Sequence, residues 1–294
     1  MLIYPFLFLF GICLGSFLNV VIDRAPKGKS IIRTRSHCDY CKKTLGVLDL
    51  IPIVSFLLLG GRCRYCGKKL SWQYPLIELA TGILFVTTYY FLPDHFNLVE
   101  PSKLISQVNI NFVLNLLEKF FYLILVLYMI TIFMIDLKLE IVLERVINSA
   151  IIITLLFKIA LLVFFFLQNS FVFYPSMWSP FKVYGFFEIF INFLTGGAIA
   201  LFFLFLIEVS KHRGMGEGDV KIGFWIGLAL GLKAILALFI AFVGGAMVGL
   251  LLIVLGKKKF GQTVPLAPFL MTGMYIALLW GDKIINWYLA TFLR

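Results

Sequence analysis

The sequence predicts an all-α integral membrane protein with about eight transmembrane helices and a small polar insert near the N-terminus. Of its 294 residues, 61% are hydrophobic and the mean hydropathy is +0.99, whereas soluble domains are roughly half apolar. Apolar runs of about 20 residues, the length that a helix needs to cross the hydrocarbon core, recur along the chain. The net charge of +11 therefore indicates basic cytoplasmic loops rather than a nucleic-acid partner.

The apolar runs predict eight spans. The first run lacks the basic n-region of a signal peptide, so we expect it to be retained. The run at 220–256 is too long for one helix and is interrupted at Gly231-Leu232-Lys233, which makes its first part a short span or a re-entrant helix. The expected spans are 2–22, 74–92, 112–135, 146–166, 185–209, 220–232, 234–255 and 264–279, with 289 as an alternative end of the last span. Three domains follow: the first span at 1–22, a cytoplasmic insert at 23–73, and a domain of about seven spans at 74–294.

The distribution of Lys and Arg predicts the orientation of these spans. The loops 23–73, 136–145, 210–221 and 256–262 hold 11, 2, 3 and 3 basic residues, most of the 26 in the chain. The positive-inside rule places these loops in the cytoplasm and both termini outside. Asp136 and Asp219 then lie at the cytoplasmic ends of their helices.

Four of the five cysteines form two C-x-x-C pairs, Cys38/Cys41 and Cys63/Cys66, within the basic insert. Two such pairs complete the tetrahedral sulfur set of a structural zinc site. The alternative is a pair of disulfides, which a reducing cytoplasm disfavours. A catalytic zinc is disfavoured because four cysteines leave no open coordination position. Cys13 lies in the first apolar run and is expected to pack as a small apolar residue.

Asp136 and Asp219 are the best candidates for a catalytic pair. Two close carboxylates that share a proton can activate water for peptide hydrolysis. The alternative is that each caps a helix N-terminus, which fits the position of Asp219 well. Lys221 is either a partner that tunes Asp219 or a cytoplasmic anchor. A transporter that uses both acids as ion sites is a further alternative.

Several motifs, taken together, resemble the bacterial type IV prepilin peptidases, which belong to the G-x-G-D intramembrane aspartyl proteases. The resemblance runs from residue 11 to about 275 and is specific because many motifs occur in the family's order. The matching segments are GSFLNV at 15–20 with Arg24 and Pro26, LIPxxS at 50–55, GRCRYCG at 61–67, YPLIE at 74–78, GMGEGDVK at 214–221 and PxxPF at 265–269.

The resemblance implies that Asp136 and Asp219 are catalytic, with Gly216, Gly218 and Lys221 in support. Gly216 and Gly218 would let the substrate backbone come close. The first catalytic aspartate of the family opens a D-x5-I-P-like segment. Here Asp136 and Ile141 fit that segment, but Leu143 stands where proline is usual.

The resemblance also implies the reaction, the cofactors and the partners. Such enzymes cut the basic leader of prepilins and pseudopilins, which precedes an apolar helix, after a Gly at the cytoplasmic face of the bacterial cytoplasmic membrane. Many then N-methylate the new N-terminus with S-adenosylmethionine, and the four-cysteine insert is typical of these bifunctional members. No nucleotide-binding motif locates the methyl donor, so Glu78, Gly61 and Arg62 are the candidates for its site. The alternatives are a peptidase without methyltransferase activity and a presenilin-like peptidase, which would not explain the insert.

Overall fold

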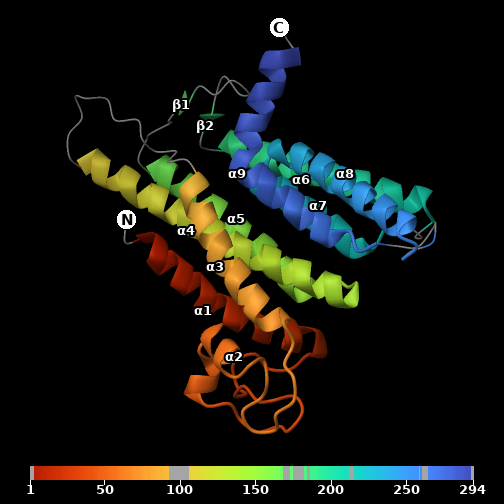
Figure 1. Cartoon of the computed structure of the whole chain (residues 1–294). Helices are drawn as coiled ribbons and strands as arrows, with labels where there is room; N and C mark the ends of the chain where they lie inside the picture. The colour runs from red at the N-terminus through yellow and green to blue at the C-terminus, as the bar shows by residue number, and fades with distance from the viewer. Residues whose placement is uncertain are drawn as a thin grey trace. The chain divides into compact units, whose positions relative to one another are not determined.

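The computed structural model describes residues 3–92, 106–167, 173–174, 182–183, 186–211, 215–257, 259 and 264–292. Figure 1 shows a chain built from long helices. The elements are α1 (Ile3–Arg24), η1 (Ala25–Lys27), η2 (Val47–Leu50), α2 (Val54–Leu58), α3 (Gln73–Phe91), α4 (Ser106–Leu139), α5 (Glu144–Leu167), β1 (Phe173–Tyr174), β2 (Lys182–Val183), α6 (Phe186–Val209), α7 (Glu217–Leu230), α8 (Lys233–Val254) and α9 (Ala267–Phe292).

The predicted all-α membrane fold is confirmed. A helix lies at each of the eight expected apolar runs, although the helix at 220–232 is short. Among the described residues, α1, α4, α5, α6 and α8 are long and apolar enough to cross a membrane. The short antiparallel pair β1–β2 was not expected. The break predicted near Gly231 is present, because Gly231 adopts a φ of 58° between α7 and α8.

The chain forms two compact units, Met1–Thr131 and Ile132–Arg294, with the boundary inside α4. In the first unit α1 packs along α3. Glycines permit this close approach, since a Cβ on Gly11 would lie 2.9 Å from Gly82 Cα and one on Gly15 would lie 2.7 Å from Glu78 Cα. The G-x-x-x-G pattern at 11–15 is therefore a helix-packing face.

In the second unit, α7 is the central buried helix. Ile222, Trp225, Ile226 and Leu228 are fully buried, and the Trp225 indole donates a hydrogen bond of 3.0 Å to Thr154 on α5. Figure 1 shows α6, α8 and α9 gathered around α7, and each of them contacts it. A helix of only 14 residues is stable here because neighbouring helices cover it on several sides.

Ion pairs between described residues join helices of the second unit, and two of them hold α5 to α6 and α8 to α9. Lys158, which interrupts an apolar run, lies 3.1 Å from Glu188 of α6. Lys233 at the head of α8 lies 2.6 Å from Asp282 of α9. A charge in an apolar helix is tolerated when it has a partner of opposite sign, which accounts for Lys158.

The α6–α7 contact yields a test with a matched control. A Cβ on Gly196 would lie 2.8 Å from the Phe224 carbonyl oxygen, whereas a Cβ on its neighbour Gly197 would meet nothing within 4 Å. We expect Gly196→Ala to destabilise the protein by about 1–3 kcal/mol through overpacking. Gly197→Ala is expected to be neutral or slightly stabilising. Thermal unfolding in detergent measures both, and equal effects would contradict this packing.

Candidate active site and metal centre

The two C-x-x-C pairs fold into two turns of the same design. Cys38 N donates to Lys43 O, and Lys42 N donates to Cys38 O. The second turn repeats both bonds, from Cys63 N to Lys68 O and from Gly67 N to Cys63 O. Lys42 and Gly67 occupy the matching left-handed position, with φ of 58° and 68°. Each turn therefore presents two sulfurs in the same local geometry.

The four sulfurs are arranged as a metal site requires. All lie within 4.8 Å of one another, and the Sγ atoms of Cys38 and Cys66 are 3.9 Å apart. A tetrahedron with Zn–S bonds of about 2.3 Å has sulfur–sulfur edges of roughly 3.8 Å. Disulfide bonds are about 2.05 Å long, and the four cysteines are free thiols. The donor set and its spacing fit a tetrahedral metal ion, and the disulfide alternative is not what the structure contains.

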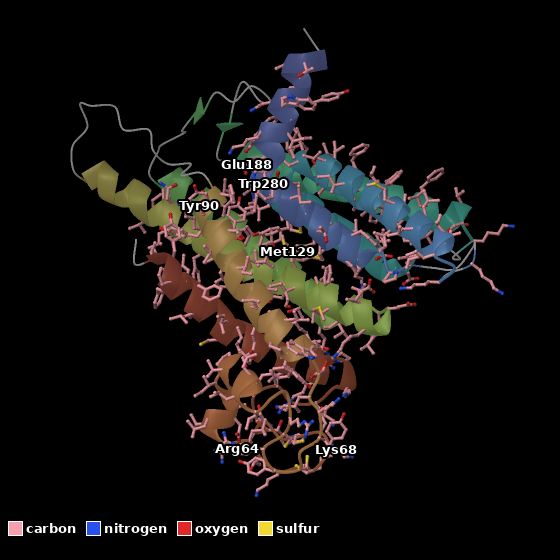
Figure 2. All side chains as sticks on the ribbon, in the orientation of Figure 1. Arg64, Lys68, Tyr90, Met129, Glu188 and Trp280 are labelled. Atoms are coloured by element: carbon pink, nitrogen blue, oxygen red, sulfur yellow. The ribbon has the colours of Figure 1, made fainter. Side chains whose placement is uncertain are left out.

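Charged and aromatic side chains tie the two turns together. Lys43 of the first turn lies 4.4 Å from the ring centre of Tyr65 in the second, and Lys68 lies 4.9 Å from the ring centre of Tyr40 in the first. Figure 2 labels Lys68 and Arg64 on these loops, near the sulfur atoms. Each turn thus supplies one lysine and one tyrosine to a pair of cation–π contacts. Each contact stabilises the insert by about 0.5–1 kcal/mol at an exposed site.

Asp49 anchors the second turn to the rest of the insert. Its carboxylate accepts hydrogen bonds from Arg64 Nε at 2.7 Å, Tyr65 Oη at 3.0 Å and Gly46 N at 3.0 Å. Burial acts to raise the pKa of Asp49, but the hydrogen bonds and the Arg64 charge outweigh it and leave the pKa below its usual value. The carboxylate is therefore ionised at neutral pH.

The residues predicted as methyl-donor candidates all lie in the first unit. Glu78 is buried on α3, and its Oε2 accepts a 2.7 Å hydrogen bond from Ile53 N of the insert. Gly61 has a φ of 69° and packs against the Phe56 ring. Arg62 forms an isolated antiparallel β-bridge with Lys69 through the backbone, at the base of the second cysteine turn. The contacts of Glu78 and Gly61 thus hold the insert together.

Asp136 and Asp219 both lie in the second unit, and each is held at a helix N-terminus. Asp136, in the last turn of α4, is buried, and its Oδ2 accepts a 3.2 Å hydrogen bond from Ala267 N, the first residue of α9. Asp219, in the first turn of α7, accepts a 3.3 Å bond from Gly216 N. The capping role weighed for Asp219 is therefore present. Helix N-termini favour negative charge, so both sites suit carboxylates.

The two carboxylates are close enough to influence each other. Asp219 directly precedes the apolar part of α7. Burial is the largest cause that raises its pKa, which reaches about 6. The negative charge of Asp136 acts in the same direction, while the hydrogen bond from Gly216 opposes it. Two interacting carboxyl groups titrate as a pair, and one of them keeps a proton to higher pH.

The link between α4 and α5 holds the head of α7. Val142 of this link lies against Gly218, where a Cβ would be 2.5 Å from Val142 Cβ. Glu144, at the start of α5, forms an ion pair with Lys221 of α7. Both contacts connect the segment that follows Asp136 to the turn that carries Asp219. A Cβ on Gly216, by contrast, would meet nothing among the described residues nearer than the Gly218 amide nitrogen at 4.0 Å.

Three contributors to this arrangement were missed from the sequence. Ala267 acts through its backbone, although the PxxPF motif around it was noticed. Val142 is an ordinary aliphatic residue, and nothing in the sequence marks it as part of a functional site. Glu144 lies 77 positions before Lys221, and no sequence pattern links the two residues.

The fold and the site define a polytopic helical membrane protein with a carboxylate pair and a four-cysteine cluster. Comparison with known proteins matches residues 9–92 to the bacterial peptidase A24 N-terminal domain. The chain is 31% identical to a prepilin leader peptidase/N-methyltransferase of Bacillus subtilis (strain 168), over 96% of each chain. A protein of the same name from Aeromonas hydrophila is 28% identical over 99% of this chain and 96% of its own. No solved structure matches the chain.

This chain belongs to the prepilin leader peptidase/N-methyltransferase family. The family resemblance predicted from the motifs is confirmed over nearly the whole sequence. A protein of this name from Myxococcus xanthus is 46% identical over 101 residues, 34% of this chain.

The Val142–Gly218 contact yields a test by size rescue. We expect Gly218→Ala to lower the thermal unfolding temperature in detergent, because the new methyl group overlaps Val142, and overpacking costs about 1–3 kcal/mol. Val142→Gly in the same chain should restore part of the loss. Val142→Ala should not, since it keeps the Cβ that clashes. Equal behaviour of the two double variants would show that Gly218 is needed for another reason.

Proposed function

We propose that this protein is a membrane aspartyl endopeptidase that removes the leader of prepilins or pseudopilins and then N-methylates the new N-terminal residue. The observation that carries the proposal is the pair of interacting carboxylates at the heads of two helices, in a chain of this family. A transporter has no support from the relatives, which share the peptidase/methyltransferase name.

The hydrolysis follows from the shared proton of the pair. One member of the Asp136/Asp219 pair is ionised, and its carboxylate takes a proton from a water molecule. The water oxygen then attacks the carbonyl carbon of the scissile bond. The protonated carboxyl group donates its proton to the leaving nitrogen as the C–N bond breaks. A pKa of about 6 for Asp219 means that an appreciable fraction of this group is protonated near neutral pH.

The neighbouring residues have distinct roles in this proposal. Gly216 is open on its surface and lets the substrate backbone approach the pair. Gly218 and Lys221 act through Val142 and Glu144, and they are positioning residues. The substrate is expected to bring a basic leader to the cytoplasmic face of the bacterial cytoplasmic membrane, while its apolar helix docks laterally among the spans.

The insert supports the second activity and holds zinc. We assign Cys38, Cys41, Cys63 and Cys66 as ligands of one structural Zn²⁺, because their sulfurs already stand at tetrahedral spacing. A metal ion supplies folding energy to a segment too small for a large apolar core. S-adenosylmethionine supplies the methyl group to the free amine that cleavage exposes, and Glu78, Gly61 and Arg62 remain the candidates near its site.

The carboxylate pair is tested by Asp136→Asn and Asp219→Asn. Each change removes an ionisable group while keeping the shape, so each should lower cleavage of a co-expressed prepilin by at least 10³-fold, the scale seen when members of a catalytic unit are removed. Mass spectrometry of the pilin reports the cleavage site and the methyl group together. Because methylation needs the new N-terminus, both marks should vanish together. Wild-type cleavage by either variant would exclude that residue from the pair.

The zinc assignment is tested by metal analysis of purified protein. We expect one zinc ion per chain in the wild type, and loss of most of it in Cys38→Ser and Cys63→Ser. Cys13→Ser is the matched control, because Cys13 lies in α1, outside the cluster. Zinc retained by both cluster variants would contradict the assignment.

A further inference from the structure

One stretch of the insert is apolar and exposed on one side. In residues 50–58 the side chains of Leu50, Ile51, Val54, Leu57 and Leu58 are exposed, and Leu58 is 82% exposed. Phe56 alone of these large apolar side chains turns inward, where its ring lies 5.0 Å from that of Trp72. The charged anchor of the insert, Asp49 with Arg64, directly precedes this stretch. An apolar patch of this kind in a protein surface marks an interaction site.

This stretch is hydrogen-bonded to α3 at a point where α3 packs against α1. The Ile53 amide is bonded to Glu78, and the Cα of Glu78 faces Gly15 of α1. Gly15 precedes Asp23, where α1 becomes charged, by eight residues, which is about 12 Å along a helix. Figure 1 shows α2 close to the insert-facing ends of α1 and α3. The chain therefore leaves the end of α1, forms the first cysteine turn, and comes back to α3 at Glu78 before it forms the second cysteine turn.

The backbone of the stretch is suited to an apolar surrounding. Ser55, Leu57 and Leu59 donate their amides to the carbonyls of Ile51, Ile53 and Ser55. Ile53 has a φ of 59° at the N-cap of α2, and its own amide is satisfied by Glu78. Backbone groups must be bonded internally when water is absent. Glu78 thus supplies the acceptor that this turn would lack in lipid.

We propose that residues 50–58 form an interfacial segment that lies in the cytoplasmic leaflet, with Leu57 and Leu58 in contact with lipid acyl chains. The occupant is lipid because the segment is bonded to Glu78, which faces Gly15, about two turns inside the charged end of α1, and α1 is long and apolar enough to cross a membrane. The rest of the insert is basic, as suits anionic head groups. Trp72, which is exposed at the start of α3, stands where aromatic residues gather at membrane surfaces.

A photo-crosslinker tests the occupant directly. p-Benzoylphenylalanine is placed at Leu58 in the full chain, in native membranes, and at Tyr40 as control, since Tyr40 is also exposed but belongs to the cysteine turns. After irradiation, mass spectrometry should find phospholipid adducts at position 58 at least tenfold more often than at position 40. Adducts to a second copy of the chain or to another protein at position 58, or equal lipid labelling at both positions, would overturn the proposal.

Glu78 provides a second, matched comparison on the same readout. Glu78→Gln keeps an acceptor for Ile53 N, whereas Glu78→Leu removes it. Lipid labelling at position 58 should persist in the Gln variant and fall several-fold in the Leu variant. Zinc content shows whether the cysteine turns remain folded in both. Undiminished labelling in a zinc-loaded Leu variant would exclude Glu78 as the residue that holds the segment at this depth. None of these readouts depends on peptidase activity.

Discussion

The close approach of Val142 to Gly218 is the contact on which the carboxylate site depends. It fixes the link that follows Asp136 against the first turn of α7, which carries Asp219. A side chain at 218 would separate the two segments, and the interaction between the carboxylates falls with distance. The second glycine of G-x-G-D is thereby explained by the protein's own packing, while the first glycine is exposed and has room for a side chain among the described residues. The Lys221–Glu144 pair crosses the same junction.

Helix N-termini explain why two carboxylates can be held together. Asp219 is bonded to the amide of Gly216 at the head of α7, and Asp136 to the first amide of α9. Each helix end supplies a donor and a partial positive charge to one acid. The same bonds orient the carboxylates before a substrate arrives. Capping and catalysis, first weighed as alternatives, are compatible roles of one side chain.

The helices and the cysteine cluster could be predicted from the sequence, and the two aspartates could be proposed from it, because each has a local signature. Apolar runs define the helices, C-x-x-C spacing defines the sulfur set, and Gly216-x-Gly218-Asp219 defines the head of α7. Contacts between segments far apart in the chain could not be predicted from the sequence. Ala267 binds Asp136 across 131 positions, and Val142 meets Gly218 through shape alone. Glu78 shows the same limit, since its partner is a backbone amide that no side-chain pattern reveals.

The central claim is that Asp136 and Asp219 act as one unit, and a double-mutant cycle on cleavage tests it most directly. Residual kcat/KM is measured for Asp136→Asn, Asp219→Asn and the double variant with purified protein over long incubation. Residues that act as a unit are strongly non-additive, so the double variant should be no slower than the slower single variant. If the two losses multiply, the carboxylates act independently, and the account of a shared proton is wrong.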